Sequence, residues 1–148
     1  MRRWMIAVCI FAGLFAGCTS IQIPGYLQDK NSFTKQFYAG FDRTSQAVRL
    51  ALSDLGWEIE DEVSPEVYEV SPQQGIQDEL LMITKVRQTS FFVGTRYARF
   101  NVYVRSNGEL SEVELRYMTT GTFIFWKSRS YGNENISNKF FERVDRNF

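Results

Sequence analysis

Residues 96–118 read RYARFNVYVRSNGELSEVELRYM, a run in which apolar and polar side chains alternate on both sides of Asn107-Gly108. Strict alternation is typical of a β-strand that is buried on one face only. Asn-Gly is the preferred central pair of a type I′ turn, which joins two antiparallel strands. These residues therefore predict a β-hairpin with strands at 96–105 and 110–118.

The Asn-Gly turn also predicts the register of this hairpin, with Ser106 opposite Glu109. Counting outward, Val102 lies opposite Val113, and both side chains point to one face. The same face receives the other apolar residues of the two strands, which are Ala98, Phe100, Leu115 and Tyr117. Because turn chemistry and hydrophobic pattern agree, this face is predicted to lie on the core.

The other face of the predicted hairpin carries aromatic and charged side chains. They are Tyr97, Arg99, Asn101, Tyr103 and Arg105 on one strand, and Glu112, Glu114, Arg116 and Met118 on the other. A solvent-facing sheet surface of mixed charge accounts for most of this pattern. The register places Arg99 opposite Arg116, and a like-charge pair destabilises a sheet unless something neutralises it. A neighbouring strand or a partner could supply the carboxylate, so the candidate partner-binding residues here are Tyr97, Arg99, Tyr103 and Arg116.

The same register, extended away from the turn, predicts an aromatic cluster in which Phe92 falls opposite Phe123. Core packing under the last helix is one interpretation of this cluster. The other is an exposed aromatic tip that contacts a membrane interface or a protein partner. The two cations that follow, Lys127 and Arg129, favour lipid headgroups. The further candidate partner-binding residues are therefore Phe91, Phe92, Phe123, Phe125 and Trp126.

The rest of the chain predicts two helices and several strands. Asp42 is a good N-cap for a first helix that Gly56 ends, and a last helix begins near Asn133 or Asn135. Further strands are predicted at residues 34–39, 57–60, 67–70 and 79–87. We therefore expect an α+β fold: a single antiparallel β-sheet of about five strands with two helices packed on one face, in the order β-α-β-β-β-β-α.

The N-terminus has the organisation of a secretory signal, with Arg2 and Arg3 before an apolar stretch over residues 4–16. Its end, Phe15-Ala16-Gly17-Cys18, resembles the lipobox of bacterial lipoproteins, although the usual leucine three residues before the cysteine is Phe15 here. The resemblance implies a diacylglyceryl group on the Cys18 thiol, cleavage just before Cys18 and acylation of the new amine.

Further expectations follow from this resemblance. Aspartate after the cysteine implies retention in the inner membrane, and Thr19 in that position implies the outer membrane. The order of elements is also similar to that of small periplasmic lipoprotein modules of the outer-membrane assembly machinery. Two alternatives stay open: an ordinary signal peptide cut elsewhere, and a transmembrane anchor, for which a helix needs roughly 20 apolar residues.

On this reading the chain divides into a signal peptide (1–17), a lipidated cysteine with a flexible tether (18–32) and a periplasmic α+β domain (33–148). The other cysteine, Cys9, leaves with the signal, so the mature chain has no disulfide. Loss of Arg2 and Arg3 leaves 15 basic and 17 acidic residues, a net charge of about −2. This balance gives no reason to expect nucleic acid as a partner.

The chain has no histidine, which removes the commonest general base and the commonest zinc ligand. Six carboxylates gather at Glu58, Glu60, Asp61, Glu62, Glu66 and Glu69. Two of them could serve glycoside hydrolysis, and a group of them could bind a cation. Glu58, Glu60 and Glu62 are instead predicted to share one solvated strand face. Ser128 beside Lys127 lacks any supporting motif.

We therefore expect a lipoprotein anchored to the outer membrane, with its domain in the periplasm and no cofactor. Its expected role is non-enzymatic binding or scaffolding, with the membrane and other envelope proteins as partners. One alternative is a carrier of lipid or another hydrophobic ligand, for which an apolar cavity between helices and sheet would argue. The other is a carboxylate-dependent envelope enzyme.

Overall fold

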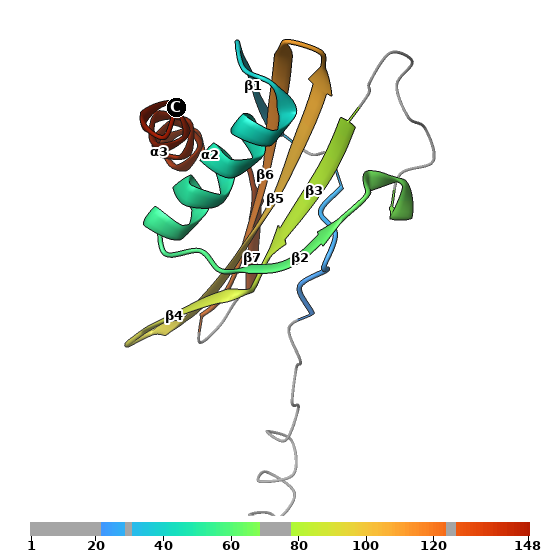
Figure 1. Ribbon diagram of the computed structural model, residues 1–148. Helices are drawn as coiled ribbons and strands as arrows, with labels where there is room; N and C mark the ends of the chain where they lie inside the picture. Colours follow the sequence, from blue (N-terminus) through green and yellow to red (C-terminus); the bar gives the residue numbers. More distant parts are fainter. Residues whose placement is uncertain (1–21, 29–30, 69–77, 124–126) are drawn as a thin grey trace, which may run out of the picture.

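The computed structural model describes residues 22–28, 31–68, 78–123 and 127–148. These residues form one antiparallel sheet and two α-helices, α2 (Phe41–Asp54) and α3 (Glu134–Arg146), with a 3₁₀ helix at Pro65–Val67 (Figure 1). The α+β class is therefore confirmed. The 3₁₀ helix lies where the sequence predicted the start of a strand at 67–70, and residues 69–77 lie outside the described part.

Two long strands form the centre of the sheet, β5 (Gly94–Asn107) and β6 (Leu110–Phe123), which pair along their whole length. Near the turn that joins them, β3 (Asp78–Thr84) pairs with β5, and β2 (Ile59–Val63) pairs with β3. On the other side of the hairpin, β1 (Phe33–Phe37) pairs with β6.

At the end away from that turn, two further strands flank the long hairpin. β4 (Arg87–Phe91) pairs with β5, and β7 (Lys127–Tyr131) pairs with β6. The described sheet therefore has seven strands, and the expected number of about five was too low. The predicted strand 79–87 is split, because the pairing is interrupted after Thr84 and resumes with β4, which continues along β5 in the same direction.

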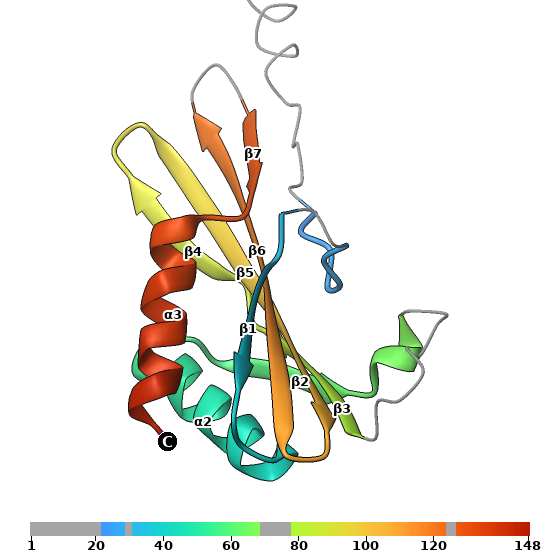
Figure 2. The same cartoon turned by 90° about the horizontal axis from the view of Figure 1, so that it is seen from above.

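Both helices cover the same face of the sheet, as expected, and the main core lies between the two layers (Figures 1 and 2). The sequence assigned six hairpin residues to this core face, and all six are buried there. They are Ala98, Phe100, Val102, Val113, Leu115 and Tyr117. The helices contribute Ala47, Val48, Ala51, Leu52, Phe140, Phe141 and Val144.

The helix ends follow the local sequence. The α2 helix begins after Gly40, so Asp42 lies in the first turn and is not the N-cap. Its carboxylate still favours the helix start through the helix dipole. Gly56 has a φ of +74°, a conformation that glycine adopts readily after a helix. The side chain of Asn133 caps α3 by accepting a hydrogen bond from the amide of Ile136 at 3.1 Å.

The register of the β5–β6 hairpin differs from the prediction by two residues. Ser106 lies opposite Ser111, and the two-residue turn consists of Gly108 and Glu109. Gly108, with a φ of +76°, takes the first central position, where type II′ turns carry glycine. A shift of two residues returns every side chain to its original face, so the hydrophobic pattern could not distinguish the two registers.

The face of the sheet away from the helices is covered by residues 22–28, which we call the N-terminal strap (Figure 2). Leu27 in the strap is buried, and its amide donates a hydrogen bond to the side-chain oxygen of Asn101 on β5. The side-chain amide of Asn101 donates in turn to the Gly25 carbonyl at 3.2 Å. The strap lies in the stretch that the sequence assigned to a flexible tether, and it packs on the sheet.

Candidate functional site

The predicted second face of the hairpin is not a solvent-facing surface. Arg99, Tyr103 and Arg116 are buried, because the strap and the neighbouring strands cover them, while Tyr97 is half-buried. Arg116 donates hydrogen bonds to the Leu27 carbonyl at 3.1 Å and to the Tyr26 hydroxyl at 2.8 Å. Arg99 and Arg116 therefore bind the chain's own strap, and Tyr103 belongs to an apolar cluster against which Tyr26 of the strap packs.

Charges on this face are neutralised within the molecule. Glu114 accepts hydrogen bonds from Arg116 at 2.6 Å and from Arg105 at 2.8 Å. Arg99 pairs with Glu60 at 2.5 Å. The predicted opposition of Arg99 and Arg116 does not occur, since the observed register places Arg116 opposite Asn101. Both carboxylates come from the chain itself: Glu114 lies on the same strand as Arg116, and Glu60 lies on β2, which β3 separates from β5.

The acidic residues of β2 do not share one face. A bulge between Ile59 and Asp61 interrupts the alternation, so Glu60 reaches Arg99 while Glu62 pairs with Arg49 of α2 at 2.8 Å. The hydrogen bond from Arg49 holds the pKa of Glu62 below its usual value. Among the described residues, no group of three or more histidine, cysteine, aspartate or glutamate side chains is placed to hold a metal ion.

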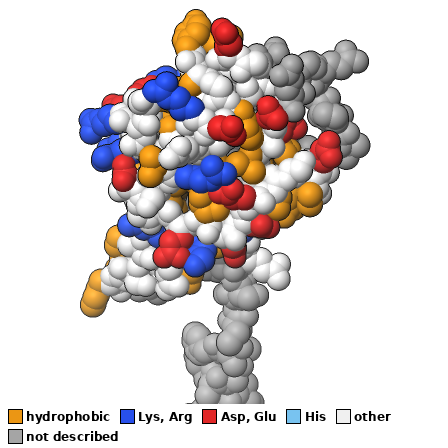
Figure 3. Space-filling model, in the orientation of Figure 1, with side chains coloured by type: hydrophobic (Ala, Val, Ile, Leu, Met, Phe, Trp, Pro, Cys, Tyr) orange, Lys and Arg blue, Asp and Glu red, His pale blue; other side chains and the backbone are white. Residues whose placement is uncertain are grey.

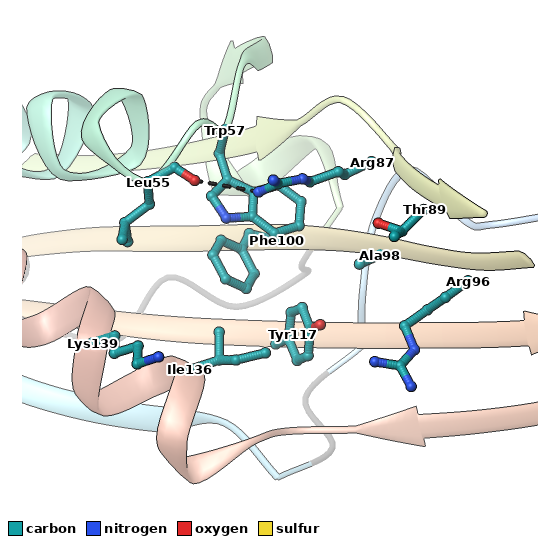
Figure 4. Close-up of a pocket in the computed structure, with 10 residues that line it drawn as sticks. All are labelled: Leu55, Trp57, Arg87, Thr89, Arg96, Ala98, Phe100, Tyr117, Ile136 and Lys139. Carbon is teal, nitrogen blue, oxygen red and sulfur yellow. Dashed lines mark hydrogen bonds between the residues drawn. The ribbon is translucent and has the colours of Figure 1, made fainter. Parts of the chain in front are cut away.

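A pocket of about 270 Å³ opens between α3, the end of α2 and the sheet (Figure 4). Its floor is aromatic and apolar, and its rim carries three cations. The floor consists of Leu55, Trp57, Ala98, Phe100, Tyr117 and Ile136, and the rim consists of Arg87, Thr89, Arg96 and Lys139. We call it the Trp57 pocket.

The end of α2 positions the centre of the pocket. The helix ends at Asp54, and the chain leaves it through Gly56 so that Trp57 stacks on Phe100 with ring centroids 4.3 Å apart. Phe100 meets Tyr117 edge to face at 4.9 Å. Arg87 donates a hydrogen bond to the Leu55 carbonyl at 3.3 Å, and its guanidinium lies 5.5 Å above the Trp57 ring. A cation at a helix C-terminus is favourable, so Arg87 also stabilises this end of α2.

The pocket has a positive electrostatic character. Among the described residues, no carboxylate lies within 4.0 Å of the charged atoms of Arg87, Arg96 or Lys139. Burial raises the pKa of the Tyr117 phenol above its usual value, while the charges of Arg96 and Arg87 oppose this shift. The Tyr117 hydroxyl is therefore neutral at physiological pH. An apolar group can lie on the aromatic floor while an anion meets the cations of the rim.

Sequence reasoning did not find the Trp57 pocket, because its residues come from both helices and several strands. One signal was present. The stretches 85–108 and 115–133 contain no aspartate or glutamate, although the whole chain has equal numbers of acidic and basic residues. Of the cations in the first stretch, Arg87 and Arg96 have no described carboxylate within 4.0 Å, whereas Arg99 and Arg105 pair with acids from outside it.

Two of the remaining candidate residues lie at the end of the sheet. Phe91 and Phe92 are exposed at the β4–β5 turn, and Phe91 pairs with Gly94. The predicted pairing of Phe92 with Phe123 is therefore wrong, since Phe123 lies opposite Gly94. The Phe123 side chain, Phe125, Trp126 and Cys18 lie outside the described part.

Comparison with models of known protein families found no match, and comparison with curated proteins found none either. In the described part of the chain, neither helix has the length and apolar character needed to cross a membrane. The geometry of the Trp57 pocket is therefore the main structural basis for a functional proposal.

Proposed function

We propose that this chain is a lipoprotein of the bacterial cell envelope, anchored to the outer membrane through lipid on Cys18, and that its periplasmic domain is a non-enzymatic binding module. The Trp57 pocket is its binding site. The ligand class is an amphipathic anion, meaning an apolar group that carries a carboxylate, phosphate or sulfate. It is either a small molecule or a group on another envelope component.

The observation that carries this proposal is the combination of an aromatic floor and a rim with cations only. Leu55, Trp57 and Ile136 are partly exposed and offer apolar surface to a ring or a short chain, and Trp57 stacks on the buried Phe100 beneath it. Arg96 and Lys139 stand beside it without a described carboxylate partner. Charge-assisted hydrogen bonds are stronger than neutral ones, so the rim selects a negative group next to the apolar part.

The volume of the pocket favours a module that binds part of a ligand over a carrier that encloses a whole one. Sites that enclose a drug-sized ligand usually measure about 300–1,000 Å³. The Trp57 pocket, at about 270 Å³, can hold only part of such a molecule. A carrier of lipid or another hydrophobic ligand is the second candidate function, which the apolar floor supports. A carrier should co-purify with stoichiometric lipid, whereas the binding module should not.

The pocket can be tested by calorimetric titration with decanoate and with decyltrimethylammonium, which share a chain length and carry opposite charges. We expect decanoate to bind more tightly. The double variant Arg96→Gln, Lys139→Gln should weaken decanoate binding roughly five- to twentyfold, as expected for two partly exposed charge contacts.

A matched control is Arg143→Gln, Lys35→Gln, which removes the same charge from cations that pair with Asp54 and Asp145 outside the pocket. This control should bind decanoate like the unmodified protein. Equal binding of the two amphiphiles, or equal loss in both double variants, would show that the pocket is not an anion site.

The anchor requires its own test. The intact mass of protein extracted from membranes should carry the added lipid, and a Cys18→Ala variant should lose this mass and leave the membrane fraction. If the variant stays membrane-bound, the lipid anchor is not what holds the chain.

A further inference from the structure

The β4–β5 hairpin ends in three consecutive apolar residues that are exposed. Phe91 pairs with Gly94, so Phe92 and Val93 form the two-residue turn. Phe92 is fully exposed, and Phe91 and Val93 are each about half exposed. In Figure 3, apolar side chains protrude at the lower left, where Figure 1 places the end of this hairpin. We call residues 91–93 the β4–β5 tip.

The charged residues near this tip on the neighbouring described strands are all cations. Arg87 and Arg96 come from the hairpin itself, and Lys127 and Arg129 come from β7. Arg96 also lies over the Phe91 ring, with its guanidinium 5.6 Å from the ring centre. Lys127 and Arg129 are exposed. Exposed phenylalanine with adjacent lysine and arginine is the composition of segments that lie in a membrane interface.

The N-terminal strap begins at the same end of the sheet as the β4–β5 tip (Figures 1 and 2). Gln22, its first residue, lines one groove together with Tyr97 of β5 and Arg129 of β7. Tyr97 follows Val93 of the tip by four residues along β5, or about 13 Å. Cys18 is four residues before Gln22, a span of at most about 14 Å. The β4–β5 tip and the thiol of Cys18 can therefore both reach the surface of one membrane.

We propose that the β4–β5 tip inserts into the surface of the bilayer that holds the lipid on Cys18, and that anionic phospholipid headgroups contact the cations around it. The position of that bilayer rests on the proposed function. The contact fixes the orientation of the domain, with the mouth of the Trp57 pocket near the membrane, because Arg87 and Arg96 line that pocket too.

A membrane fits this tip better than a protein partner does. The apolar residues form a protruding turn, and the cations around it have no described carboxylate partner. Charge complementarity therefore favours an anionic surface. The short span from Gln22 to Cys18 brings the bilayer to this end of the molecule.

The test uses the full lipidated chain in vesicles of phosphatidylcholine and phosphatidylglycerol. A Phe92→Cys variant is labelled with an environment-sensitive fluorophore, since lipid blocks the only other thiol of the mature chain. Nitroxide-labelled lipid should quench this fluorophore several-fold more than the same fluorophore on a Tyr38→Cys variant. Tyr38 is also almost fully exposed, but it follows β1 at the opposite end of the sheet, where Phe37 pairs with Ser111.

Removing two cations should weaken the contact. In the Phe92→Cys background, Lys127→Gln with Arg129→Gln should lower the population of the inserted state by about fivefold for each cation lost. The same effect should follow from replacing phosphatidylglycerol with phosphatidylcholine. Equal quenching at positions 92 and 38 would overturn the proposal. Strong quenching at position 92 that is the same without the two cations and without phosphatidylglycerol would overturn it too.

Mass spectrometry of the same sample separates this proposal from that of the anchor. A lipidated chain with equal quenching at both positions refutes the tip contact and leaves the anchor intact. A chain without lipid refutes the anchor, and both labels are then read in a Cys18→Ser background on added vesicles, where the same criteria apply. Capture of an envelope protein by a photo-crosslinker at position 92, without lipid quenching, would assign the tip to a protein partner instead.

Discussion

The two faces of the β5–β6 hairpin are both buried, yet they are covered by opposite kinds of chemistry. Phe100 and Val102 face the helices and belong to the main hydrophobic core. Asn101 and Tyr103, their neighbours along the same strand, face the strap, where charged and hydroxyl groups lie beside a small apolar cluster of Leu81, Ile83 and Tyr103. One strand thus takes part in a hydrophobic core on one side and in a polar network on the other.

The apolar face therefore contributes mainly to the stability of the fold, and the polar face mainly determines which segment can cover it. A fully buried leucine or phenylalanine contributes about 1.5–3 kcal/mol through the hydrophobic effect. A buried ion pair loses hydration that its Coulomb energy only partly repays, so its net contribution is small. On the polar face, each buried polar side chain instead needs a hydrogen-bond or ion-pair partner. Only a segment with the right carbonyl and amide positions, such as residues 24–27, satisfies Asn101 and Arg116 together.

The helix-covered face should give the largest effect on stability. Phe140 is fully buried against Phe100, and Phe140→Ala should lower the free energy of unfolding by about 3–5 kcal/mol through lost burial and a cavity. Denaturant unfolding measures this loss. The matched control, Phe92→Ala, removes the same atoms from an exposed turn and should change stability by less than about 0.5 kcal/mol. A loss below about 1 kcal/mol for Phe140→Ala would mean that α3 is loosely packed.

The strap-covered face should respond differently, because breaking a buried pair costs more than removing it. Arg116→Met leaves Glu114 with Arg105 alone and should lower the free energy of unfolding by about 3 kcal/mol. The double variant Arg116→Met, Glu114→Leu should recover much of that loss, since the buried carboxylate is removed as well and Arg105 keeps Glu112 at 3.5 Å. If the double variant is as unstable as the sum of the single ones, the ion pair itself provides net stability, and the contrast between the faces fails.

Several parts of this fold could be predicted because they depend on local patterns. Alternation assigned the core face of the hairpin correctly, and helical spacing located both helices. The register could not be predicted, because either glycine turn keeps Val102 on the same face. A bulge at Glu60 separated it from Glu62, which the sequence had placed on the same face, and period-two counting has no signal for such an insertion.

The candidate sites depended on long-range contacts and were therefore the weaker predictions. The strap reaches Asn101 across 74 residues, and its own sequence has no periodicity that predicts a packed segment. Arg99 and Arg116 were selected for an apparent charge conflict, and the structure resolves it with Glu60 and Glu114. Phe91 and Phe92 were assigned an exposed tip as one of two alternatives, and the exposure of both residues agrees with it.

The smallest effect should come from the strap itself. Leu27→Ala removes a buried side chain whose loss would cost about 2–5 kcal/mol in a rigid core. Because a short terminal segment can detach without unfolding the sheet, we expect only about 1–2 kcal/mol in global unfolding. Hydrogen exchange should show the remaining free-energy loss as local opening of the strap. The amide of Leu27, which is bonded to Asn101, should exchange much faster, while the amides of Phe100 and Val102 should keep their protection. Gln28→Ala, at an exposed position of the strap, should leave all three unchanged. If Leu27→Ala instead accelerates the sheet amides equally, the strap opens only with the whole domain, and both faces then belong to one cooperative unit.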